Sequence, residues 1–296
     1  MKEIESPAMP AMKYGYAQRI VLFFCITLVC LIVAVLAISI VGRGEVTTLS
    51  LRISTIIQDV LVFVMPPVIT AVMVSTLPAR FLAVDTCFSL KFLTVATFVM
   101  LVSIPAMNAL VVWNESLVLP EGLSELEAWM RESEETANAS VKVLLGGTSV
   151  GDLVVSFLIV AVLAGVSEEM FFRGALQRLL ASGSLNPHVA IWLAAVIFSA
   201  FHVQFYGFFP RLFLGAYFGY LLWWSRSIWV PVMAHVFNNG IVVCSMWHSQ
   251  NAGVEQSGDM NNLGIDSAWM IVASVVLVVI GIGALRKISL DERKEM

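Results

Sequence analysis

The chain has 296 residues, of which 59% are hydrophobic and only 13% are charged, and its mean hydropathy is +0.88. Soluble domains usually carry about 45–50% apolar and about 25% charged residues, so this composition excludes a soluble enzyme and a disordered chain. A formal net charge of −4 offers no basic patch for a phosphate backbone, which excludes a nucleic-acid-binding protein. We therefore expect an all-α, polytopic membrane protein that is embedded in the lipid bilayer.

Eight segments are apolar and long enough to cross a bilayer, since a spanning helix needs about 20 residues. They cover roughly residues 20–42, 58–78, 92–113, 149–168, 189–207, 209–224, 228–247 and 268–285. The Pro66-Pro67 pair and Pro105 fall inside spans and should kink them, which membrane helices tolerate when neighbouring helices satisfy the freed carbonyl groups. Asn186-Pro187 is typical of a helix start, because proline fits the first turn.

The basic residues predict the orientation, because Lys and Arg are concentrated in cytoplasmic loops. With eight spans and a cytoplasmic N-terminus, twelve of the 17 Lys and Arg residues lie inside and five lie outside. The sequence therefore predicts an integral protein of the plasma (inner) membrane with both termini in the cytoplasm. The acidic segment 114–148 would lie outside as a solvated, partly helical loop.

Three of the four cysteines, Cys25, Cys30 and Cys244, lie in apolar runs. The sequence contains no Cys-x-x-Cys pair and no Cys/His spacing typical of zinc. We therefore expect small buried hydrophobic residues rather than a disulfide or a metal site.

Strongly polar residues within the spans are concentrated between residues 165 and 240, and intramembrane ionisable residues are costly enough to be functional-site candidates. They form three groups: Glu168-Glu169-x-x-x-Arg173, Phe198-x-x-x-His202 and His235-x-x-x-Asn239. Residues four apart share a helical face, so Glu169 and Arg173 should form an ion pair. Glu168 should then be free to face another helix.

Helix lengths predict that the three groups lie in one layer. Glu168 precedes the turn near residue 184 by about 24 Å of helix, and His202 follows it by about 27 Å. The same estimate puts His235 within about 10 Å of the level of His202. We therefore expect the acids and histidines to meet inside the helix bundle.

The three groups, in this order on separate helices, resemble the CAAX protease and bacteriocin-processing (CPBP) family of intramembrane endopeptidases, also called the abortive-infection family. The resemblance divides the chain into N-terminal helices and an acidic loop (1–147), a CPBP-type catalytic core (148–248), and a last loop, helix and tail (249–296). It implies a helical membrane fold and hydrolysis of a peptide bond in a protein or peptide substrate, with prenylated and bacteriocin-like peptides as candidates.

The resemblance also implies roles for individual residues. Glu168 and His202 would activate water, while His235 and Asn239 would stabilise the oxyanion. Glu169 and Arg173 would give structural support. The residue types suit this chemistry, since carboxylates and imidazoles accept protons and side-chain N–H groups can bind a developing oxyanion.

Three alternatives stay open. Glu168, His202 and His235 would also make a zinc site with an open position for water; the amide of Asn239 is a poor ligand, so we expect no firm cofactor and keep zinc as the alternative. A proton-relaying transporter would favour inverted repeats, which the sequence lacks. A non-catalytic bacteriocin-immunity or scaffold protein would keep the fold and tolerate Glu168→Gln.

Overall fold

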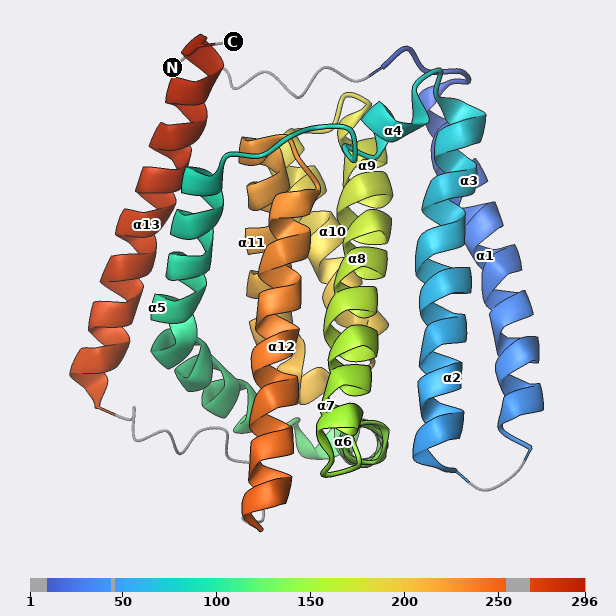
Figure 1. Cartoon of the computed structure of the whole chain (residues 1–296), viewed down its shortest axis with the longest axis vertical. Helices are drawn as coiled ribbons and strands as arrows, with labels where there is room; N and C mark the ends of the chain where they lie inside the picture. Colours follow the sequence, from blue (N-terminus) through green and yellow to red (C-terminus); the bar gives the residue numbers. More distant parts are fainter. Residues whose placement is uncertain (1–9, 44–45, 254–266, 296) are drawn as a thin grey trace.

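The computed structural model describes residues 10–43, 46–253 and 267–295, which form a bundle of helices (Figure 1). These residues contain no strand beyond an isolated bridge between Met12 and Ser75. The all-α fold class is therefore confirmed. Lys2 and most of the loop predicted after residue 249 lie outside the described residues.

Most of the long helices run alternately up and down the bundle (Figure 1). The first half consists of α1 (Tyr16–Val41), α2 (Thr48–Gln58), η1 (Asp59–Val64), α3 (Met65–Val74), α4 (Pro78–Phe81), α5 (Leu90–Glu115), η2 (Glu121–Leu123) and α6 (Ser124–Leu144). The second half consists of α7 (Val150–Ser156), η3 (Phe157–Leu163), α8 (Ala164–Glu169), η4 (Met170–Gln177), α9 (Arg178–Ala181), α10 (Pro187–Phe201), η5 (Phe205–Gly207), α11 (Phe208–Ser225), α12 (Trp229–Ala252) and α13 (Ala268–Glu295). Elements η1, η3 and η4 are π-helical turns inside longer helices, whereas η2 and η5 are short 3₁₀ turns.

Within the described residues, six helices are long and apolar enough to cross a membrane, rather than the eight predicted. They are Tyr16–Val41, Thr48–Val74, Leu90–Glu115, Val150–Ala181, Trp229–Ala252 and Ala268–Lys294. The remaining two predicted spans are α10 and α11. With 15 residues α10 is about 22 Å long, short of a hydrocarbon core about 30 Å thick. The 18-residue α11 is less apolar because it contains Arg211 and four Tyr or Trp residues.

Helices α10 and α11 pack against each other as a hairpin within the bundle. A hairpin leaves the number of crossings even, and accordingly α1 begins and α13 ends at the same end of the bundle (Figure 1). Which side of the membrane this end faces stays a prediction. Helix α10 begins as predicted, with Asn186 as its N-cap and Pro187 in its first turn.

Pro105 interrupts α5, and a neighbouring helix satisfies the backbone groups around it. Ser274 Oγ on α13 donates to the Val102 carbonyl (2.6 Å) and accepts from the Ala106 N–H (3.2 Å). Figure 1 shows α5 bending in its second half. The inserted hydroxyl explains how this membrane helix tolerates an internal proline.

The cysteines do not occupy the core. Cys25, Cys87 and Cys244 are exposed, Cys30 is half-buried, and all four are free. The expectation of buried cysteines is therefore wrong. The reason is that spanning helices bury little of their surface in the protein: only 17% of the apolar window of α1 is buried. Lipid tails are as apolar as leucine, so lipid-facing positions need not be polar.

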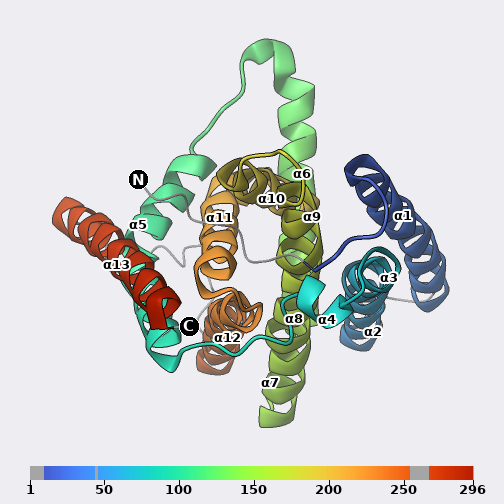
Figure 2. The ribbon, with the colours of Figure 1, turned by 90° about the horizontal axis from the view of Figure 1, so that it is seen from above.

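The motif-bearing helices occupy the middle of the bundle. Seen from above, α8, α10, α11 and α12 lie between α1–α3 on one side and α5 with α13 on the other (Figure 2). One apolar cluster joins the α1–α3 side to η4 and α10; its aromatic members are Phe23, Phe63, Phe81, Phe171, Phe172 and Phe198. A second cluster joins α5 and α13 to α11 and α12. The centre is therefore fixed from both flanks.

Candidate active site

Glycine at position 165 brings α8 into close contact with α12. A Cβ atom built on Gly165 would lie 2.9 Å from Val236 Cγ2 and 3.2 Å from the Val236 backbone nitrogen. No larger residue fits without moving one of the two helices. Glu168 and Glu169 follow Gly165 by one turn, and His235 immediately precedes Val236 on α12. The close packing therefore puts the two acids beside His235.

Glu169, Arg173 and His235 form a buried triad with exposed fractions of 0%, 1% and 4%. Arg173 Nη1 donates to Glu169 Oε1 (2.7 Å), and His235 Nδ1 lies 2.8 Å from the same oxygen. Arg173 Nη2 also donates to the Gly215 carbonyl (3.0 Å). The predicted ion pair is thus present. An oxygen that pairs with the Arg173 guanidinium accepts hydrogen bonds, so His235 Nδ1 carries the hydrogen that it shares with this oxygen.

Glu168 lies on the other side of His235. Glu168 Oε2 is 3.8 Å from His235 Nε2, so His235 stands between the two glutamates. The same Oε2 atom is buried without a hydrogen-bond partner in the part of the chain that the structure describes. The ring of Phe218 stacks on His235 at a centroid distance of 5.1 Å and fixes its plane. Glu168 therefore faces another helix, as predicted, and keeps an oxygen free.

His202, the C-cap of α10, has a defined tautomer. Its Nδ1 atom is 2.9 Å from the Phe198 carbonyl oxygen. A carbonyl only accepts, so Nδ1 carries a hydrogen and the lone pair of a neutral His202 is on Nε2. His202 lies near enough to both Glu168 and His235 for their charges to interact. The structure thus brings together the acid and both histidines that the sequence singled out.

Asn239 makes hydrogen bonds that the sequence analysis did not predict. Its Nδ2 atom donates to the Val160 carbonyl in η3 (3.0 Å), and its Oδ1 atom accepts from Asn238 Nδ2 (3.2 Å). It therefore contacts the neighbouring helix, although one of its two amide hydrogens stays available. Its expected role at an oxyanion stays a prediction.

Two polar residues that the sequence analysis did not assign hold the loop after His202. Asn114, at the end of α5 and only 2% exposed, donates to the Phe205 carbonyl (3.1 Å) and accepts from the Phe209 N–H (2.9 Å). Glu134 on α6 accepts from Gln204 Nε2 (3.2 Å). The acidic segment is helical and exposed, as predicted, but α6 also braces this loop. The sequence signal for Asn114 was an amide residue at the end of an otherwise apolar span.

Asp59 is a third acid near the site that the sequence analysis missed. It begins η1, is 2% exposed, and its Oδ2 atom has no hydrogen-bond partner among the described residues. Element η1 packs on α8, and Asp59 is near enough to Glu168 for the two charges to interact. As an ionisable residue inside the predicted 58–78 span, it met the rule for functional candidates.

Three π-helical turns border the site: η1 begins with Asp59, η3 carries Val160, and η4 follows Glu169 and carries Arg173. Such turns are frequent at functional sites. Sequence reasoning assumed regular α-helices here, because the extra residue of a π-turn leaves no clear periodic signal.

The arrangement does not fit a preformed zinc site. Both histidines present one free Nε2 atom, and their chemistry would suit zinc. However, the described residues contain no group of three or more His, Cys, Asp or Glu side chains that could hold a metal ion. Glu168, His202 and His235 are therefore neighbours that do not form a coordination shell.

The chain resembles known proteins over its motif-bearing part. Residues 150–241 match the family described as type II CAAX prenyl endopeptidase Rce1-like. The uncharacterized protein YpbD of Bacillus subtilis (strain 168) is 26% identical over 93 residues, which are 30% of this chain and 44% of that protein. The match thus spans less than half of that relative. No solved structure matches the chain. The resemblance to the CPBP family is therefore confirmed for residues 150–241, the Rce1-like segment that carries all three motifs.

Proposed function

We propose that this chain is an intramembrane endopeptidase that hydrolyses a peptide bond of a protein or peptide substrate, with water activated by Glu168 and His202. One observation carries this proposal. The Phe198 carbonyl holds the Nδ1 hydrogen of His202, so its Nε2 atom is left as an acceptor near the unpartnered Glu168 carboxyl group. A carboxylate and a neutral imidazole are side chains that commonly take a proton from an attacking water.

In this mechanism the water oxygen adds to the substrate carbonyl carbon while its proton passes to Glu168 or His202. The carbonyl oxygen becomes an oxyanion. When the C–N bond breaks, the protonated side chain returns the proton to the leaving amine, which balances the step. The products are a new carboxylate and a new amine.

The geometry adds a condition on His235. Its Nδ1 proton is engaged with Glu169, so Nε2 donates to an oxyanion only when the ring is an imidazolium. Asn239 would add its second amide hydrogen. Together these donors would supply oxyanion stabilisation.

The family description supports a prenylated protein as one candidate substrate, and a bacteriocin-like peptide is the other. Membranes from cells that express wild-type protein or Glu168→Gln would be compared by mass spectrometry of newly formed peptide termini. We expect termini that appear with the wild type and are missing with Glu168→Gln. Glu132→Gln, an exposed acid on α6, is the matched control and should behave like the wild type. The same set of newly formed termini in both membrane samples would mean that this chain does not produce them, which would favour a non-catalytic scaffold.

A further inference from the structure

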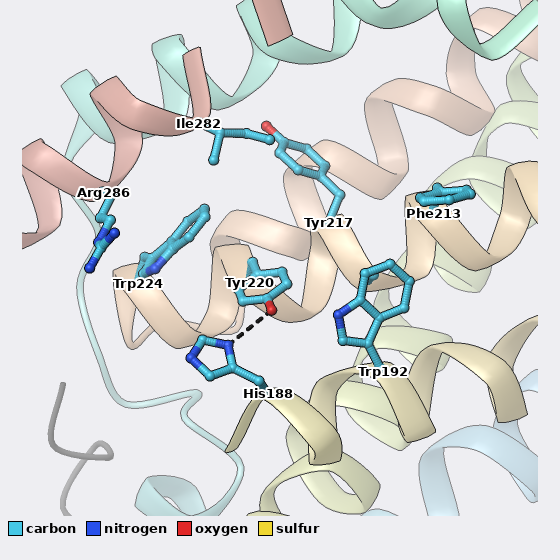
Figure 3. A pocket seen from close by; sticks show the side chains of 9 residues that line it. His188, Trp192, Phe213, Tyr217, Tyr220, Trp224, Ile282 and Arg286 are labelled. Carbon is cyan, nitrogen blue, oxygen red and sulfur yellow. Dashed lines mark hydrogen bonds between the residues drawn. The ribbon is translucent and has the colours of Figure 1, made fainter. Parts of the chain in front are cut away.

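A cavity outside the candidate active site opens between α10, α11 and α13. Its volume is about 440 Å³. It is lined by His188, Trp192, Phe213, Ala216, Tyr217, Tyr220, Trp224, Ile282 and Arg286, most of which Figure 3 shows around one space. Most of these side chains are aromatic, and the two that can carry a positive charge are a histidine and an arginine.

The cavity is polar at one end and apolar at the other. Figure 3 shows Arg286 and His188 near Trp224 at one end, and Phe213 with Trp192 at the other. Arg286 is the first charged residue after the apolar part of α13, so it lies where that helix would leave the hydrocarbon. It is exposed and makes no ion pair or hydrogen bond with another described residue. The polar end thus carries, at the membrane boundary, a positive charge that no described acidic residue pairs with.

A second cavity of about 450 Å³ continues the first toward the bundle interior, between α5, α11 and α13. The two share Phe213, Tyr217 and Ile282, and the second is otherwise lined by apolar side chains and Ser103. From Arg286 to Val275 the combined groove follows α13 for eleven residues, or about 16 Å. This is about half of a 30 Å hydrocarbon core, the depth of one leaflet.

The groove is separate from the candidate active site, because the two lie on different faces of α11. Phe218 stacks on His235, and the Gly215 carbonyl accepts from Arg173. Tyr217 and Tyr220 line the groove instead. A ligand in the groove therefore has no direct contact with Glu168 or the two histidines through these residues.

We propose that the groove binds one anionic phospholipid, with its phosphate group at Arg286 and an acyl chain along α5, α11 and α13. A guanidinium group suits phosphate oxygens. Tyr and Trp rings are typical of the headgroup level, and the apolar cavity below has the depth of one leaflet. The unpaired charge of Arg286 favours an anionic headgroup over a zwitterionic one.

The test uses the full-length protein purified in a non-ionic detergent. Mixed micelles would supply phosphatidylglycerol or phosphatidylcholine, and native mass spectrometry would measure the lipid retained. We expect one phosphatidylglycerol to be retained about fivefold more strongly, the effect of one basic side chain on anionic lipid binding. Arg286→Gln should abolish this preference. Lys287→Gln is the matched control, because Lys287 is exposed and adjacent but lines neither cavity, and it should keep the preference.

Several results would overturn the proposal. Equal retention of the two lipids by the wild type would do so whether or not a variant folds, as would an equal loss in Arg286→Gln and Lys287→Gln. Displacement of phosphatidylglycerol by inorganic phosphate alone would show a simple anion site. Displacement by farnesol would assign the groove to a prenyl chain, and loss of lipid on dimer formation would assign it to a second copy.

Discussion

The two sides of α8 differ in the partners of their carboxyl groups. On the side of Glu169, one carboxylate oxygen accepts from both Arg173 and His235, all three residues are buried, and only the second oxygen lacks a partner among the described residues. On the side of Glu168 and Asp59, each residue also has a buried carboxyl oxygen without a hydrogen-bond partner, and neither residue pairs with an arginine in the described structure. Bonded buried charges hold a structure together, whereas unpartnered ones are costly unless they serve a function. Adjacent glutamates therefore have different expected roles.

The largest expected effect is on the bonded side. Arg173→Ala should remove the guanidinium that pairs with the buried Glu169 and leave His235 as the one side chain that still bonds this carboxylate among the described residues. Breaking such a pair costs about 3–5 kcal/mol, so folded yield and the thermal midpoint in detergent should fall sharply. Arg131→Ala, which breaks an exposed pair with Glu127, is the control and should change stability little. A normal thermal midpoint for Arg173→Ala would remove the distinction between the two sides.

Asn239→Ala should affect rate rather than folding. If its free amide hydrogen binds the oxyanion, turnover should fall about 10²–10³-fold with residual activity. The lost bond to the Val160 carbonyl should lower stability only modestly. Single-turnover cleavage in proteoliposomes measures the rate. An unchanged rate would mean that Asn239 serves only its contact with η3.

Asp59→Asn should test whether the unpartnered side of α8 takes part in catalysis. The change keeps the shape and replaces a buried carboxyl group that lies near Glu168. Turnover should fall severalfold while the thermal midpoint stays close to that of the wild type, and single-turnover cleavage measures the change. Asp85→Asn, near the end of the bundle, should leave turnover unchanged. An unchanged turnover for Asp59→Asn would exclude Asp59 from the site.

The smallest expected effect concerns the loop after His202. Asn114→Ala removes two hydrogen bonds and leaves a buried N–H and C=O unsatisfied, which costs about 1–3 kcal/mol. We expect faster hydrogen exchange in residues 203–209 and a severalfold loss of turnover. Asn138→Ala on exposed α6 is the control. Unchanged exchange in the loop would show that α6 alone holds it.

Periodicity within one helix explains what the sequence could predict. Glu169 and Arg173 are four residues apart on one continuous helix, so their ion pair was predictable from local geometry. The same geometry predicted that Glu168 points away from Arg173. The bond between His235 and Glu169 depends on how α12 is rotated against α8, which the close contact at Gly165 sets. No spacing within one helix contains that rotation. For the same reason the direction of Asn239 was not predictable.

The number of spans was overestimated because apolar residues continue beyond the end of α10. The predicted span 189–207 is longer than the helix, which ends at Phe201, and Arg211 lowers the hydropathy of α11. An acid inside an apolar span is a visible signal, but Asp59 stands alone in its span, whereas the predicted site residues are clustered between residues 165 and 240. Its importance arises from the packing of η1 on α8.

The most direct test compares Glu168→Gln with Glu169→Gln, two identical chemical changes at adjacent positions. Thermal midpoint, folded yield and cleavage rate would be measured for both in the same proteoliposomes. We expect Glu168→Gln to fold like the wild type and to cleave nothing, and Glu169→Gln to lose folded yield because Arg173 is left unpaired. Equal losses of yield in the two variants, or cleavage by Glu168→Gln at the wild-type rate, would contradict the assignment of Glu168 to catalysis and Glu169 to support.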